Sequence, residues 1–248
     1  MFKRLVTSLV LLILFFIPSN IAFAAPNHVG LNFGYEGYLG GQSHGFRVGL
    51  MTEYFYTEEI GVSLVASYSS INTGMYLGEP LKERVLNGGV YVKYNAFDFG
   101  NIGIGFVGGA TVIHSNELID YETAFEMSIF QLSLGAYLRY DISNNFSIYG
   151  EVLSSVFKVG VADFSLIENG LTADSISLRL DKGYLAPFVC VKIIGKYIIS
   201  PTICVGLEVD IKNIGIKKAP FVDYYQLLAP LLADLNTYGI GVYVGLSF

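Results

Sequence analysis

Apolar and polar residues alternate along most of this chain with a period of two. In segments 28–38, 128–140 and 201–212, aliphatic or aromatic residues occupy one parity, and Gly, Ser, Asn and charged residues occupy the other. Successive side chains of a β-strand point to opposite faces, so this period indicates strands with one apolar face. We predict an all-β protein with ten strands at 28–38, 46–56, 60–71, 85–96, 102–113, 128–140, 146–157, 184–195, 201–212 and 237–248.

The connections between these predicted strands alternate between short and long. The short ones are 57–59, 97–101, 141–145 and 196–200. The long ones extend up to segments 158–183 and 213–236. Transmembrane β-barrels have short turns on one side and longer loops on the other. An even strand number would place both chain ends on the short-turn side, and eight or twelve strands remain alternatives to ten.

Composition favours a membrane location for this sheet. Hydrophobic residues make up 52% of the chain and charged residues only 15%. After residue 24, no apolar stretch reaches the roughly 18 residues that a transmembrane helix needs. A closed barrel is the other way to satisfy the backbone in lipid. A soluble β-sandwich or lipocalin-like barrel would instead have to bury the apolar faces of 18 Tyr and 18 Phe residues. We therefore expect a transmembrane antiparallel up-and-down β-barrel.

The first 24 residues are typical of a secretory signal peptide. Lys3 and Arg4 precede the apolar run 5–17, and Ala22 and Ala24 frame a small-x-small cleavage motif. The apolar run is shorter than the roughly 20 residues of a membrane-spanning helix. We expect 1–24 to be removed on export and 25–248 to form a single barrel domain.

The last predicted strand carries the most specific motif. Its apolar face is formed by Ile240, Val242, Val244, Leu246 and Phe248, which alternate with Gly, Tyr and Ser. This end resembles Gram-negative outer-membrane β-barrel proteins, whose final strand typically ends in Phe. The resemblance covers the mature chain in pattern but only this strand in motif. It implies a monomer in contact with outer-membrane lipid and lipopolysaccharide, with the five residues read by the barrel-assembly machinery. The chain departs from the usual aromatic girdle because it contains no Trp.

Charged residues on the inward parity are balanced. Removal of residues 1–24 leaves 13 basic and 21 acidic residues, which argues against a nucleic-acid partner. The predicted lumen network contains Glu36, Arg47, Glu53, Lys93, Arg139, Glu151, Lys192, Glu208, Asp210 and Lys212. Because a barrel of this size is only slightly wider than those that side chains fill, we expect a largely filled, salt-bridged lumen. A narrow water path is the alternative.

The excess negative charge falls in the predicted outer loops. Loop 114–127 contains Glu117, Asp120, Glu122 and Glu126, and loop 158–183 is also rich in carboxylates. We expect a solvated face. The functional alternatives are binding of divalent cations shared with lipopolysaccharide phosphates and repulsion of anions at the mouth. Apolar residues in 220–235 recur at helical spacing, which predicts a short helix in the last outer loop.

The two cysteines, Cys190 and Cys204, fall inward on adjacent predicted strands, on either side of the turn at 196–200. An oxidising compartment permits a disulfide between them. We therefore predict a possible cross-strand disulfide.

The sequence contains no convincing catalytic, cofactor or metal site. The residues His114, Ser115 and Asn116 resemble the sets used by barrel lipases and lipid A deacylases, but adjacent strand residues point to opposite sides. His44 lacks the acidic pairs of omptin-type proteases, and His28 has no evident partner. We therefore expect a structural or surface-interaction barrel that is not an enzyme and needs no cofactor. A narrow passive channel is the first alternative and a hydrolase of lipid or peptide the second.

Overall fold

The computed structural model describes residues 28–38, 43–76, 79–118, 123–168, 171–181, 185–213 and 236–247. These ranges contain eleven strands: β1 (His28–Tyr38), β2 (His44–Phe55), β3 (Ile60–Tyr76), β4 (Glu79–Asp98), β5 (Ile102–Leu118), β6 (Thr123–Ser143), β7 (Phe146–Glu168), β8 (Leu171–Leu180), β9 (Val189–Ser200), β10 (Ile203–Asn213) and β11 (Asn236–Ser247). No helix in these ranges is long and apolar enough to cross a bilayer. The predicted signal peptide, the predicted helix 220–235 and Phe248 lie outside the described residues.

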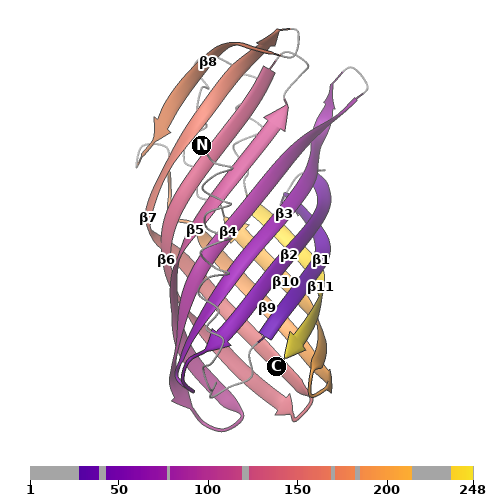
Figure 1. Ribbon diagram of the computed structural model, residues 1–248, viewed down its shortest axis with the longest axis vertical. Coiled ribbons are helices and arrows are strands. Elements are labelled where there is room, and N and C mark those ends of the chain that lie inside the picture. Colours follow the sequence, from indigo (N-terminus) through magenta and orange to yellow (C-terminus); the bar gives the residue numbers. More distant parts are fainter. Residues whose placement is uncertain are drawn as a thin grey trace.

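Ten of the strands form a closed antiparallel barrel, as predicted. Neighbouring strands pair consecutively from β1 through to β7, and β7 then pairs with β9. Strands β9, β10 and β11 continue the wall, and β11 closes it by pairing with β1. The eleventh strand, β8, pairs with the outer part of β7, where it forms an additional edge (Figure 1). Closure satisfies the backbone groups of the first and last barrel strands with each other.

The strands are strongly tilted against the barrel axis (Figure 1). A ladder of cross-strand partners that leaves β7 at Ser147 passes through Asn32 on β1 and returns to β7 at Gly160. Such a stagger is what tilts the strands of a closed barrel and sets its diameter. It also brings side chains that are distant in sequence to the same level of the lumen.

The wall has two heights. Strands β1, β2, β9, β10 and β11 contain 11 or 12 residues each, whereas β3 to β7 contain 17 to 23. The short turns lie together at one end, so the additional length projects at the other end, where β8 joins it (Figure 1). We call β3 to β8 the tall wall.

The half of the barrel near the short turns has an apolar outside and a polar inside. On β6, Leu134 and Leu138 are 58% and 48% exposed, whereas Gln131 and Ser133 are buried. Large exposed hydrophobic side chains occur on all ten barrel strands. An uninterrupted apolar belt of this kind is expected only where a protein faces lipid, and we call it the lipid belt.

The projecting part of the tall wall has the opposite distribution. Further along β6, Phe125, Met127 and Ile129 are buried inward, whereas Glu126 and Ser128 point outward. The inward residues belong to one apolar cluster that comprises Tyr38, Ile71, Ile113, Phe125, Met127, Ile129, Ala162, Phe164, Leu180 and Leu185. Beyond the lipid belt, the wall therefore has the organisation of a water-soluble β-structure.

This reversal explains where the predicted boundaries were wrong. Much of the predicted loop 114–127 belongs to β5 and β6, and β7 and β8 occupy most of the predicted loop 158–183. Outward-facing apolar residues at every second position end at the edge of the lipid belt. The strands continue beyond it, but with polar residues on their outer face. Most of the predicted loop 213–236 lies outside the described residues, as do Asp120 and Glu122.

The fourth short turn was also misplaced. The predicted turn 196–200 lies within β9, and the chain reverses at Pro201 and Thr202 instead. The predicted strand 184–195 corresponds to β9, which begins at Val189 and ends at Ser200. Apolar residues of 196–200 continue the strand pattern, and Pro cannot donate to a sheet ladder.

The lipid belt can be tested with Arg substitutions on the outward face of β6. Leu134→Arg should lower the free energy of unfolding by about 2–4 kcal/mol, the range for a cation near the bilayer midplane. Glu126→Arg is the matched control beyond the belt and should have little effect. Denaturant unfolding in lipid vesicles would measure both, and equal losses would contradict the assigned belt.

Candidate functional site

The lumen contains a cavity of about 600 Å³. Inward residues from all ten barrel strands line it, and all ten charged residues of the predicted lumen network are among them. At the short-turn end the cavity reaches Glu58 and Asp98. At its other end it reaches Val85 and Ile113, which belong to the apolar cluster or pack against it. The cavity is therefore a polar chamber between the short turns and the apolar cluster.

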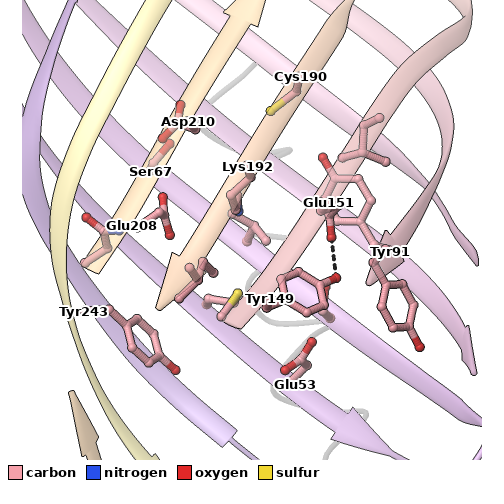
Figure 2. A pocket seen from close by; sticks show the side chains of 18 of the residues that line it. Glu53, Ser67, Tyr91, Tyr149, Glu151, Cys190, Lys192, Glu208, Asp210 and Tyr243 are labelled. Carbon is pink, nitrogen blue, oxygen red and sulfur yellow. Dashed lines mark hydrogen bonds between the residues drawn. The ribbon is translucent and has the colours of Figure 1, made fainter. Parts of the chain in front are cut away.

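The first ion-pair network in this chamber is centred on Arg47. Arg47 donates to Asp210, and its Nη2 lies 3.0 Å from Oε1 of Glu208. Lys212 Nζ lies 2.9 Å from Asp210 and 3.5 Å from Glu36. The network joins β1, β2 and β10, and Figure 2 shows both of its β10 carboxylates at the cavity. Buried charges are tolerated only with such close partners.

A glycine on β11 makes room for this network. A Cβ at Gly239 would lie 2.4 Å from Nη1 of Arg47 and 2.7 Å from Asp210. Any larger residue would therefore displace the guanidinium from its carboxylate. The inward-facing glycines of β11 therefore have a packing role, which the alternation of apolar and polar residues does not predict.

The second network is centred on Lys93. Lys93 donates to Glu53, and its Nζ lies 4.0 Å from Glu151. Tyr149 donates a 2.7 Å hydrogen bond to Glu151, shown as the dashed line in Figure 2. The ammonium group also lies 4.7 Å from the ring centroid of Tyr149, within the range of a cation–π interaction. A charge buried in this way is held by several partners at once.

The remaining two predicted cations differ from each other. Arg139 lies at the short-turn mouth, where it pairs with Asp98 at 3.1 Å and Asp141 at 3.2 Å. Lys192 is the direct cross-strand neighbour of both Glu151 and Asp210. Among the described residues it forms no ion pair, since those carboxylates are engaged by other cations.

Sequence reasoning missed a buried carboxylate beside the apolar cluster. Glu83 on β4 is only 7% exposed, and it accepts hydrogen bonds from Tyr38 and Ser115. Glu83 lies just before the predicted strand 85–96, so it was not assigned to the lumen. Its inward parity with Val85 and Asn87 would have placed it there if the strand had been extended.

Comparison with known proteins agrees with this architecture. No protein-family model and no curated protein matches the sequence. Among solved structures, the chain is similar to the outer membrane protease OmpT from Escherichia coli, with 10% identity, coverage of 92% of this chain and 97% of that one, and a TM-score of 0.56. The chain has the fold of an outer-membrane β-barrel.

Two further solved structures match this barrel with lower TM-scores. The translocator domain of the autotransporter NalP from Neisseria meningitidis is 9% identical over 99% of this chain and 96% of that one, with a TM-score of 0.43. An outer membrane channel from Pseudomonas putida F1 is 9% identical over 93% of this chain and 99% of that one, with a TM-score of 0.42.

The barrel does not form the possible disulfide. Cys190 lies opposite Lys212, whereas Cys204 lies opposite Ile198, so the two thiols are at different levels of the β9–β10 ladder. Both cysteines are buried and free. The prediction placed the turn within what is the end of β9, and that shift in register separates the two residues.

The histidines occupy three separate places. His28 lies inside the barrel, with Nδ1 3.1 Å from the hydroxyl of Ser247. His44 is exposed and stacks on Tyr35 with a centroid distance of 5.5 Å. The described residues contain no group of three or more His, Cys, Asp or Glu residues that could hold a metal ion.

His114 and Ser115 point to opposite sides of the wall. Ser115 is directed inward to Glu83, whereas His114 is directed outward, with Nδ1 2.9 Å from the hydroxyl of Ser128 on β6. A His–Ser pair therefore exists on the outer surface, but with a different serine from the one in the sequence motif.

The Arg47 network can be tested by removing its central cation. Arg47→Met leaves Asp210 and Glu208 without their shared partner, and should lower the free energy of unfolding by about 3–5 kcal/mol. Arg139→Met is the control, because its pairs at the mouth are exposed and should contribute less than about 1 kcal/mol. Denaturant unfolding in vesicles measures both variants. Additional Asp210→Asn and Glu208→Gln substitutions should restore part of the loss in the first.

Proposed function

We propose that this barrel acts at the outer surface as a non-conducting protein that presents the tall wall to lipopolysaccharide and other surface molecules. The observation that carries the proposal is the reversal of polarity along the tall wall. A wall with its own apolar cluster inside and polar groups outside is built to stand beyond the hydrocarbon layer. Transport alone does not require such a projection.

The interior supports the absence of conduction. A solute that enters the polar chamber from the short-turn end meets the Arg47 network and then the apolar cluster. Phe125 and Phe164, which are direct cross-strand neighbours in this cluster, are each only 2% exposed. Moving an ion through an apolar layer without partners is strongly unfavourable.

The outer face of the wall supports a role in surface contact. Asn116 donates a 2.8 Å hydrogen bond to Glu126, and Ser177 donates to Asp163. Exposed Arg84 and Arg179 add positive charge to the same face. Mixed cations and carboxylates at this level match the phosphates, sugars and bridging cations of a lipopolysaccharide layer.

A narrow channel is the second candidate, and the chamber of about 600 Å³ is the observation that favours it. A hydrolase is less well supported. His114 and Ser128 lie opposite each other within the β5–β6 ladder. Backbone N–H groups in such a ladder are already paired, which leaves none to stabilise an oxyanion.

Planar-bilayer conductance distinguishes the first two candidates. The wild-type barrel should give no steady single-channel steps. The double variant Phe125→Ala and Phe164→Ala should conduct ions, because it removes both phenylalanine rings from the apolar cluster. Phe130→Ala is the matched control on the lipid-facing side of β6 and should remain closed. Steady steps from the wild type would refute the non-conducting proposal and favour the channel.

Surface presentation can be tested by labelling intact cells that express the barrel. Ser177→Cys on the outer face of β8 should react with a membrane-impermeant maleimide, because this residue is exposed on the projecting wall. Thr57→Cys in a short turn should react only after the outer membrane is permeabilised. The native cysteines are buried and give a low background. The reverse labelling pattern would contradict the proposed orientation.

A further inference from the structure

Three side chains that can ligate a metal ion meet inside the barrel near the short turns. They come from three neighbouring strands, His28 from β1, Cys204 from β10 and Tyr243 from β11, and all three are buried. Nε2 of His28 lies 3.7 Å from Sγ of Cys204, and the hydroxyl group of Tyr243 is hydrogen-bonded to the same Nε2 atom. A sulfur atom and an oxygen atom thus approach one ring nitrogen.

Two glycines allow these side chains to meet. β11 lies between β1 and β10 in the wall, and Gly245 on β11 is the direct cross-strand neighbour of both Gly30 and Cys204. A Cβ at Gly245 would lie 2.7 Å from Nε2 of His28 and 2.7 Å from the hydroxyl of Tyr243. A Cβ at Gly30 would overlap the ring of Tyr243. Larger residues at either position would therefore push the three side chains apart.

The second ring nitrogen of His28 has a partner of its own. Nδ1 lies 3.1 Å from the hydroxyl oxygen of Ser247. When Nδ1 donates its proton to this hydroxyl, the lone pair of Nε2 is directed at Cys204 and Tyr243. Histidines that bind metal ions almost always have such a partner, because it fixes the tautomer and the orientation of the ring. Glu53, the direct cross-strand neighbour of His28 on β2, adds negative charge nearby.

The sulfur and the nitrogen have the spacing of two ligands of one metal ion. Zn–S bonds of about 2.3 Å and Zn–N bonds of about 2.0–2.1 Å at a tetrahedral angle place the two ligand atoms about 3.5–3.6 Å apart. The observed separation between Sγ of Cys204 and Nε2 of His28 is 3.7 Å. Thiolate and imidazole are the characteristic ligands of Zn²⁺ in proteins. Only a small movement of either side chain is therefore needed to bind this ion.

The chamber gives access to this place. His28, Tyr243 and Ser247 all line the cavity, and Figure 2 shows Tyr243 at its edge. The same cavity reaches the short turns at Glu58 and Asp98. An ion can thus reach the three side chains from the short-turn end without passing the apolar cluster.

We propose that His28, Cys204 and Tyr243 form a binding site for Zn²⁺ in the wall of the chamber. The thiol of Cys204, which donates to the carbonyl oxygen of Gly245 at 3.7 Å, releases its proton to water and binds as the thiolate. The hydrogen bond from Tyr243 to Nε2 breaks, and its oxygen becomes the third ligand. Water from the chamber takes the fourth position, as in other zinc sites with three protein ligands.

The tyrosine ligand distinguishes this set from clusters of three or more His, Cys, Asp or Glu residues, none of which occurs among the described residues. The proposed zinc site does not depend on the surface role proposed above, because it faces the lumen.

Co²⁺ titration of the refolded barrel in detergent under reducing conditions tests the site, since Co²⁺ replaces Zn²⁺ in proteins and absorbs light. A sulfur-to-Co²⁺ charge-transfer band should appear in the near ultraviolet with one ion per chain, and Zn²⁺ should abolish it. Cys204→Ser and His28→Gln should each lose the band. Ser247→Ala should weaken Co²⁺ binding by about 10–100-fold, because it removes the partner of Nδ1. Cys190→Ser is the matched control and should keep the band, although Cys190 is also buried, free and in the lumen.

Unfolding midpoints separate loss of the site from loss of the fold. Zn²⁺ should raise the midpoint of the wild type and of Cys190→Ser, because it stabilises the folded barrel that binds it. It should leave the midpoints of Cys204→Ser and His28→Gln unchanged. Absence of the charge-transfer band in the wild type, or its persistence in Cys204→Ser, would overturn the proposal. An equal loss of the band in Cys190→Ser would do the same.

Discussion

The need to pair every backbone N–H and C=O group within the lipid layer governs the rest of this structure. Hydrocarbon offers no partners, so the sheet must close, and β1 pairs with β11 along its whole length. Closure with a large stagger tilts the strands and sets the width of the lumen. That lumen is wide enough for long charged side chains to cross it and meet partners from other strands.

Inside this closed wall, charge balance decides what can be buried. Arg47 reaches across from β2 to carboxylates on β10, and Lys93 on β4 reaches Glu53 on β2 and Glu151 on β7. A buried pair of this kind contributes little net stability compared with an apolar pair, but loss of one partner is costly. The networks therefore act as constraints on register, because a slip of one residue would turn these groups toward lipid.

The apolar cluster gives the barrel its asymmetry. Polar and apolar faces exchange places along single strands, at about Ile129 and Phe130 on β6. Toward the short turns, the outer surface of the strand is apolar and faces lipid. In the projecting part of the tall wall, the inner surface is apolar and the outer surface is polar. One continuous strand thereby faces lipid along one part and lies beyond the lipid belt along the other, and the cavity in the lumen ends at the same apolar cluster.

The sequence by itself determined which residues face lipid and which face the lumen, since alternation depends only on the local geometry of a strand. All ten charged residues assigned inward by parity line the chamber, and Val242, Val244 and Leu246 are exposed on the outside. Only the tertiary structure decided which residues meet, because register depends on partners that are distant along the chain. The separation of Cys190 from Cys204, the pairing of β8 with β7 and the partners of Glu83 all follow from register. The extent of the tall wall also required the fold, since its outward residues are polar and its apolar residues find one another only across neighbouring strands.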